Sequence, residues 1–249
     1  MVPKIIHYCW FGKNKMPHKL VRNINSWEKM NPSFKVIKWD ESNFNIMESN
    51  KFVKDAYLSE NWAFVSDYVR LYAIYNYGGV YLDTDVKLIK SLDQVLLRFP
   101  NGFMGYEDED YVASGLGFAA EEKNKIIGEM LRYYNTVLFD QNNKDDIACP
   151  IINTKILRKH GLLGNNKKQK INNITILPME YLCPKNLEDG KVKITNNTIS
   201  IHEYNASWMS FHKRSRIKII LFVKKILPLS TVNKLRRVFS RNDQKNFSK

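Results

Sequence analysis

The 249-residue sequence is long enough for one substantial domain with a buried core, and 44 % of its residues are hydrophobic. The three cysteines, Cys9, Cys149 and Cys183, are far apart and form no CxxC pair. Their spacing excludes a disulfide framework or a typical zinc site and favours a reducing compartment. The N-terminal segment lacks the apolar core of a signal peptide, and no apolar run of about 18 residues occurs, so the sequence predicts no single-helix membrane span.

The net charge of +14 is concentrated near the C-terminus. The segment from Lys213 to Lys249 holds 12 lysines and arginines and one acid, Asp243, so it carries +11. Residues 1–212 hold 27 basic and 24 acidic residues and are almost balanced. A partner attracted by this charge is therefore a partner of the tail, and the body shows no motif typical of nucleic-acid binding.

The N-terminal part has the pattern of a strand, a helix and a strand. Residues 2–11 form an apolar and aromatic run, residues 17–30 repeat apolar residues at helical spacing, and residues 34–39 form a second apolar run. This order predicts a βαβ unit, and with it an α/β fold with a parallel sheet. Another helix is expected over residues 52–58.

The most informative stretch combines a helix, a glycine stop, a strand and two carboxylates. The helix is expected over residues 62–77, and Gly78-Gly79 ends it because glycine accepts the left-handed conformation of a helix stop. A short apolar strand at 80–82 follows and leads directly into Asp83-Thr84-Asp85.

The spacing of four charged residues predicts two converging pairs. Asp67 and Arg70 are three residues apart and share one helix face, and Asp83 and Asp85 point to the same side of a strand. Carboxylates at the carboxyl end of a buried strand lie where open α/β sheets bind ligands, and they suit Mg²⁺ or Mn²⁺ carrying a substrate diphosphate. An isolated Asp-x-Asp is common in solvated turns, but the strand, the glycine stop and the Asp67–Arg70 pair favour a site.

Further elements are expected downstream. Residues 86–97 predict a short strand followed by a turn near 91–95, and residues 102–106 predict another strand. A helix is expected over 126–139. Late strands are expected over 174–178 and 192–201.

Two short segments between these elements have possible roles at a site. The acidic run 107–110 has two interpretations, a second metal site or a solvated loop, and the absence of calcium-loop spacing favours the loop. The small residues of 114–118 allow the backbone to approach a ligand closely.

The tail contains two basic amphipathic pieces around Pro228. The pattern fits interfacial helices lying on an anionic membrane surface, and the alternative is helices packed on the body with a solvated basic side. The predicted organisation is a catalytic domain over 1–212, a membrane-associating segment over 213–241 and a disordered end over 242–249.

Three separated blocks resemble glycosyltransferase family 32 in the same order along the chain. They are PKIIHYCWFG at 3–12, SDYVRLYAIYNYGGVYLDTDV at 66–86 and IHEYNASW at 201–208. This family of DXD-containing sugar transferases is common in bacterial capsule and surface polysaccharide clusters, and the similarity covers roughly residues 1–210. The resemblance implies a GT-A fold, a single Rossmann-like nucleotide-sugar-binding domain with a mostly parallel sheet, and a retaining transfer.

The resemblance implies roles for the central residues. Asp67 and Arg70 match the pair that holds the donor sugar hydroxyls and the phosphate side, and Tyr81 would lie near the ribose. Asp83 and Asp85 match the DXD pair. Asp85 would ligate the metal directly, and Asp83 would reach the ribose, the sugar or the ion. Asp67, Arg70 and Asp83 are therefore the expected catalytic residues.

The resemblance also implies contacts from the two ends of the domain. Tyr8 and Trp10 would surround the nucleobase, and Ser207-Trp208 would touch the diphosphate. His202 matches a position that completes the metal shell. Many relatives have two adjacent histidines here, whereas this chain has Glu203 second, so His202 or Glu203 is the expected third ligand.

The implied cofactors are Mn²⁺ or Mg²⁺ and a nucleotide-sugar donor, with UDP-hexose preferred over GDP-mannose. The acceptor is expected to be a saccharide, lipid-linked, at the inner face of the cell membrane, where the tail would hold a cytoplasmic enzyme peripherally. No sequence feature separates a nucleophile from sugar-binding acids. The working hypothesis is a same-face substitution in which the leaving phosphate helps to deprotonate the acceptor hydroxyl.

Two other classes of protein are alternatives to this interpretation. A phosphatase of the haloacid dehalogenase type also has DxD after a strand, but it needs Thr or Val two residues after the second Asp, where this chain has Lys87, and its motif lies near the start of the chain. A non-enzymatic basic protein that binds membranes or nucleic acid would depend on the tail alone.

Overall fold

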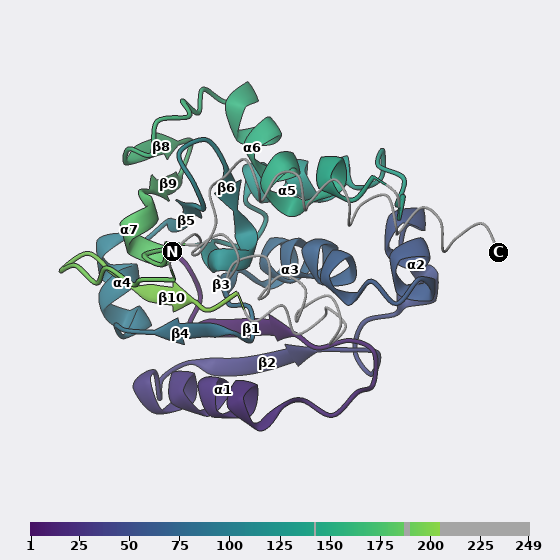
Figure 1. Ribbon diagram of the computed structural model, residues 1–249, viewed down its shortest axis with the longest axis horizontal. Helices are drawn as coiled ribbons and strands as arrows, with labels where there is room; N and C mark the ends of the chain where they lie inside the picture. Colours follow the sequence, from purple (N-terminus) through teal and green to yellow (C-terminus); the bar gives the residue numbers. More distant parts are fainter. Residues whose placement is uncertain (142, 187–189, 205–249) are drawn as a thin grey trace, which may run out of the picture. The chain divides into compact units, whose positions relative to one another are not determined.

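The computed structural model describes residues 1–141, 143–186 and 190–204, and Figure 1 shows how their elements are arranged. The helices are α1 His18–Met30, α2 Lys51–Leu58, α3 Trp62–Tyr77, α4 Leu92–Arg98, α5 Lys125–Tyr133, α6 Cys149–Lys159 and α7 Met179–Leu182. The strands are β1 Ile5–Cys9, β2 Lys35–Trp39, β3 Gly79–Tyr81, β4 Val86–Leu88, β5 Gly102–Tyr106, β6 Val112–Ala113, β7 Phe118–Ala120, β8 Gln169–Ile171, β9 Ile174–Leu177 and β10 Ser200–His202. Among these residues no helix is both long and apolar enough to cross a membrane.

An eight-stranded sheet with the order β2-β1-β3-β7-β5-β9-β8 forms the centre of the fold, and β6 pairs with β5. Strands β1, β2, β3, β5 and β9 run in one direction, whereas β7, β6 and β8 run against them. The predicted βαβ unit is present, since β1 and β2 are parallel and α1 connects them. The prediction of a mostly parallel sheet in an α/β fold is confirmed.

Both faces of the sheet are covered, because its strands are apolar on both sides. In and just after β3, Tyr81 packs into a cluster with helices α2, α3, α5 and α6, while Val80 and Leu82 pack into a second cluster with α1, α4 and α7. Figure 1 shows α1 on one side of β1 and β2, and α3 with α5 on the other. A doubly covered sheet leaves its carboxyl edge as the place for polar chemistry.

Three predicted elements differ from the structure. The segment 91–95 begins helix α4 instead of a turn, because the Ser91 hydroxyl caps the first turn by accepting from the backbone N–H of Asp93. The helix expected over 126–139 ends at Tyr133, and the strand expected over 192–201 shortens to β10. Helix α6 was not predicted, and its Pro150 lies in the first turn, where proline is tolerated.

The glycine stop after α3 has a steric reason as well as a conformational one. Gly78 and Gly79 have φ angles of 61° and 108°, in the region that favours glycine. A Cβ on Gly79 would lie 2.6 Å from the carbonyl oxygen of Ile5 in β1. The absence of a side chain at Gly79 therefore allows β3 to pair closely with β1, and this pairing determines the position of the residues that follow β3.

Gly79→Ala is expected to lower the free energy of unfolding by roughly 3 kcal/mol or more, from φ strain together with a backbone clash. Gly161→Ala is the matched control, because Gly161 has a φ of 94° but nothing within 4 Å of the added Cβ. It should lose only about 1 kcal/mol from strain. Urea unfolding of both variants measures the difference, and equal losses would contradict the close approach of β3 to β1.

Candidate functional site

The two carboxylates of the DXD sequence lie at the carboxyl edge of the sheet, directly after β3. The backbone N–H of Leu82 still bonds to the carbonyl of His7 in β1, and Asp83 and Asp85 follow in a turn. Strand β4 begins at Val86, and its antiparallel pairing with β10 places His202 opposite Val86. The pairing of two short strands thus brings a residue from the end of the described chain beside the DXD carboxylates.

Asp83, Asp85 and His202 form a cluster of potential metal ligands. Their ligand atoms lie within 4.8 Å of one another. His202 Nε2 lies 3.2 Å from Asp85 Oδ1 and 3.7 Å from Asp83 Oδ2. The alternative ligand Glu203 instead forms an ion pair with Lys19, and its backbone N–H bonds to the carbonyl of Asp85 at 3.1 Å. The geometry therefore favours His202 as the third group.

Arg70 links the helix and the strand at the centre of the site. Its Nη2 lies 3.0 Å from Asp67 Oδ1 and 3.3 Å from Asp83 Oδ1, and the predicted Asp67–Arg70 pair shares one face of α3. Tyr81 donates from its hydroxyl to Asp83 Oδ1 at 2.7 Å, and the guanidinium lies over the Tyr81 ring at 5.0 Å. Tyr81 is buried, so it orients Asp83, and its predicted contact with a ribose stays a prediction.

Burial and charge shift the pKa values of these groups in opposite directions. Burial opposes ionisation of Asp83, but the Arg70 guanidinium, His202 and the Tyr81 hydroxyl together outweigh it and lower the pKa of this carboxyl. Burial likewise disfavours the charged form of His202, but the nearby carboxylates of Asp83 and Asp85 raise its pKa. Burial raises the pKa of Asp67 to about 6, although Arg70 opposes the shift. The site is therefore a strongly coupled set of charges with Asp83 held ionised.

The donor set fits a divalent cation. Two carboxylates and one imidazole suit Mn²⁺ or Mg²⁺ better than a soft metal. The raised pKa of His202 shows that the carboxylates already attract a positive charge at the point where an ion would lie. A cation would replace the His202 proton, so its binding would release a proton and weaken as the pH falls.

Three residues near this cluster were not predicted to lie there. A Cβ on Gly115 would lie 3.0 Å from Asp83 Oδ2 and 3.1 Å from Arg70 Nη1, so the turn at 114–116 passes directly over the ion pair. The sulfur atom Sγ of Cys149, at the start of α6, lies 3.7 Å from Arg70 Nη1. Glu107, in the acidic run for which a solvated loop was favoured, is partly buried, and the charges of His202 and Asp83 act on its carboxyl. Of these three, only Gly115 was indicated by the sequence, because the small residues of 114–118 suggest a close approach of the backbone to a ligand.

The first strand ends beside the same edge. Tyr8 is half-buried against Trp27, and Trp10 donates from Nε1 to the Asn14 carbonyl at 2.7 Å. His7 accepts at Nδ1 from Trp39 and donates from Nε2 to the Gly78 carbonyl, and burial lowers its pKa to about 4. His7 is therefore neutral and structural, while the nucleobase role of Tyr8 and Trp10 stays a prediction.

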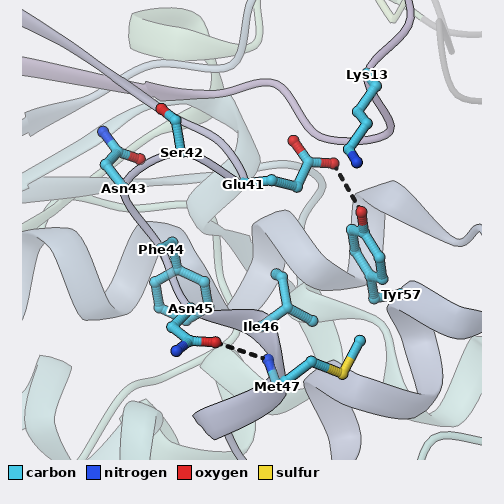
Figure 2. Close-up of a pocket in the computed structure, with 9 residues that line it drawn as sticks. All are labelled: Lys13, Glu41, Ser42, Asn43, Phe44, Asn45, Ile46, Met47 and Tyr57. Carbon is cyan, nitrogen blue, oxygen red and sulfur yellow. Dashed lines mark hydrogen bonds between the residues drawn. The ribbon is translucent and has the colours of Figure 1, made fainter.

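A pocket of ≈ 600 Å³ opens beside the loop that follows β2 (Figure 2). Its lining residues are Lys13, Glu41, Ser42, Asn43, Phe44, Asn45, Ile46, Met47 and Tyr57. Glu41 Oε1 accepts from the backbone N–H of Gly12 at 2.7 Å and from the Tyr57 hydroxyl at 3.0 Å. This carboxylate therefore ties the loop after β1 to the loop after β2 and to α2.

Some of the predicted positions lie outside the described residues. They are Ser207 and Trp208, the membrane-associating segment 213–241 and the end 242–249. Their predicted roles stay predictions.

Comparison with known proteins agrees with this geometry. The family model described as "Glycosyltransferase sugar-binding region containing DXD motif" matches residues 17–99, which include Asp67, Arg70, Asp83 and Asp85. A solved structure titled "PaToxG Glycosyltransferase" has a TM-score of 0.51 at 19 % identity and covers 64 % of this chain and 69 % of that chain. This likeness supports the fold, which is of the GT-A type.

Two curated proteins are similar in sequence. An uncharacterized glycosyltransferase of Acanthamoeba polyphaga mimivirus is 26 % identical over 199 residues, 77 % of this chain and 76 % of that protein. Inositol phosphoceramide mannosyltransferase 3 of Schizosaccharomyces pombe is 29 % identical over 102 residues, 40 % of this chain and only 28 % of that protein. The DXD turn and the ion pair beside it lie in the matching region 17–99, so over that region the chain is similar to the DXD-containing glycosyltransferases.

Proposed function

We propose that this glycosyltransferase uses a divalent cation, Mn²⁺ or Mg²⁺, to move a hexose from a nucleotide sugar to a saccharide acceptor. The observation that carries the proposal is the cluster of Asp83, Asp85 and His202 beside the buried Arg70–Asp67 pair. The cation, when bound, would neutralise the diphosphate of the leaving group. The ion pair and the cluster lie at the carboxyl edge of the sheet, where an α/β fold binds nucleotides.

Each residue of the site has a distinct role in this proposal. Asp85 and His202 would hold the cation, and Asp83, which lies between His202 and Arg70, would complete the ligand set. Arg70 offers a planar fork of donors that suits phosphate or vicinal hydroxyls. Asp67 accepts sugar hydroxyls from its position on α3. The rings of Tyr8 and Trp10 enclose the nucleobase at the end of β1.

The chemistry that we favour retains the configuration of the transferred sugar. The cluster at the DXD turn is committed to the cation, and Asp67 is held by Arg70 at 3.0 Å, so neither is placed as a free nucleophile. A same-face substitution, in which the leaving phosphate takes the proton of the acceptor hydroxyl, needs no such nucleophile. Arg70 would support this step by keeping positive charge beside the departing phosphate.

The acceptor that we propose is a lipid-linked saccharide at a membrane surface. The +11 charge of 213–249 would attract an anionic leaflet, and the similar yeast protein is named for transfer to a ceramide lipid. A cytoplasmic, peripheral location and a bacterial surface-polysaccharide pathway rest on the family resemblance and the tail alone. UDP-hexose is the preferred donor, and GDP-mannose is the alternative that the name of the yeast protein favours.

Asp67→Asn is expected to flatten the pH dependence of stability while reducing transfer. The folded pKa of about 6 exceeds the unfolded value, so ionisation of Asp67 costs stability as the pH rises from about 4 through 6. Relative to its value at pH 4, the difference in the free energy of unfolding between variant and wild type should therefore shift in favour of the variant by up to about 3 kcal/mol through this window and stay constant above it. Metal-free urea unfolding between pH 4 and 8 measures it. Asp55→Asn, on the surface of α2, is the control, and a gain that does not change with pH would contradict the role of this carboxyl.

Mn²⁺-dependent nucleotide binding should be lost in Asp85→Ala. Calorimetric titration of UDP and GDP with and without Mn²⁺ is expected to show metal-dependent binding by wild type, weakened at least about tenfold in the variant, or 1.4 kcal/mol. Asp93→Ala, which removes a surface aspartate paired with Lys4, should bind like wild type. Binding of GDP alone would assign the donor to GDP-mannose. No binding of either nucleotide by wild type would contradict the proposal.

The tail should control membrane binding without controlling chemistry. Replacing the lysines and arginines of 213–241 by glutamine is expected to abolish sedimentation with phosphatidylserine vesicles, because about 1 kcal/mol of attraction is lost with each charge near the surface. Sugar transfer to a soluble acceptor should be retained. Loss of transfer to the soluble acceptor, with vesicle binding intact, would contradict the assignment of membrane binding to the tail and of sugar transfer to the rest of the chain.

A further inference from the structure

The ring of His202 lacks the usual hydrogen bond behind a metal-binding histidine. Such histidines normally donate their second ring nitrogen to a carboxylate, a carbonyl or a water, which fixes the ring. Here Nε2 faces Asp85, while Nδ1 is buried and has no hydrogen-bond partner among the described residues. On the Nδ1 side of the ring, support must therefore come from packing.

The side chain packed on His202 is Tyr204. The two rings meet edge to face with centroids 4.2 Å apart. Tyr204 also has a φ of 52°, a left-handed conformation that is rare for a bulky residue and that persists only where the surroundings hold it. The backbone bends at this residue in the way that returns its ring to His202.

The hydroxyl of Tyr204 is held at both sides. It donates to Glu107 Oε1 at 3.1 Å and lies 3.0 Å from Cys183 Sγ, whose thiol is then the donor. Glu107 follows β5, which runs in the same direction as β3, so the carboxylate comes from the same edge of the sheet as the DXD turn. Glu107 is partly buried and is near enough for its charge to act on His202.

We propose that Tyr204 and Glu107 are positioning residues for the metal site, in which Glu107 fixes the Tyr204 ring and the ring fixes His202 as a ligand. This inference rests on the proposed function of Asp83, Asp85 and His202. It gives the acidic run 107–110 a role that is neither a second metal site nor a wholly solvated loop. It also gives a reason for the left-handed backbone at Tyr204.

The test is the affinity of the full chain for Mn²⁺ alone, measured by calorimetry. Tyr204→Phe keeps the ring and removes the hydroxyl, and we expect it to weaken Mn²⁺ binding about tenfold. Tyr57→Phe is the matched control, because it removes a comparable tyrosine–glutamate hydrogen bond of 3.0 Å that involves none of Asp83, Asp85 and His202, and it should leave the affinity unchanged.

Two comparisons show whether the effect passes through His202. In the His202→Ala background, Tyr204→Phe should cause no further loss of Mn²⁺ affinity. Glu107→Gln and Glu107→Met both remove the charge, but only glutamine keeps an acceptor for the Tyr204 hydroxyl. Glu107→Gln should therefore bind Mn²⁺ several-fold more tightly than Glu107→Met.

Each contrary result overturns a defined part. Tyr204→Phe with wild-type affinity, or with the same loss in the His202→Ala background, overturns the positioning role while the metal site stands. Wild-type affinity in His202→Ala removes His202 from the ligand set and the positioning role with it. Absence of Mn²⁺ binding by wild type overturns the proposed function as well. Thermal unfolding of every variant against Tyr57→Phe separates loss of the fold from loss of the ligand.

Discussion

The buried guanidinium of Arg70 is the charge on which the arrangement of this site depends. It is 3 % exposed, and a buried charge is tolerated only when opposite charges and hydrogen bonds surround it. Asp67 lies on the same helix as Arg70, whereas Asp83 lies just after β3. The two ion pairs of Arg70 therefore fix the position of α3 relative to the end of β3. The glycine stop makes this ion-pair arrangement possible, because α3 ends at Tyr77 and β3 begins at Gly79.

The proposed cation site depends on contacts between distant parts of the chain. Asp85 lies just after the central strand β3 in the sequence, whereas His202 is brought to the site by the pairing of β10 with β4. Tyr204 and Glu107 then add a third segment behind the histidine. The edge of the sheet therefore supplies the carboxylates, and the late part of the chain supplies the nitrogen ligand and its support.

The sequence predicted the site where its geometry is local. Helical spacing placed Asp67 with Arg70, and strand alternation placed the two DXD carboxylates together, because both depend on periods of the backbone. The positions of Glu107 and Cys149 depend on tertiary packing, so no spacing could predict them. The turn expected at 91–95 is a helix because one serine cap outweighed a weak pattern. The choice between two adjacent candidate ligands needed the register of β10.

The origin of His202 in the last described strand has a consequence for the order of synthesis. A growing chain folds from its N-terminal part, and the βαβ unit with the DXD turn is complete long before β10 leaves the ribosome. Until then the two aspartates lack their nitrogen ligand and the strand that fixes the turn. Under the proposed function, a nascent or prematurely ended chain would therefore bind the cation and the nucleotide weakly, and sugar transfer would begin only when β10 has paired with β4.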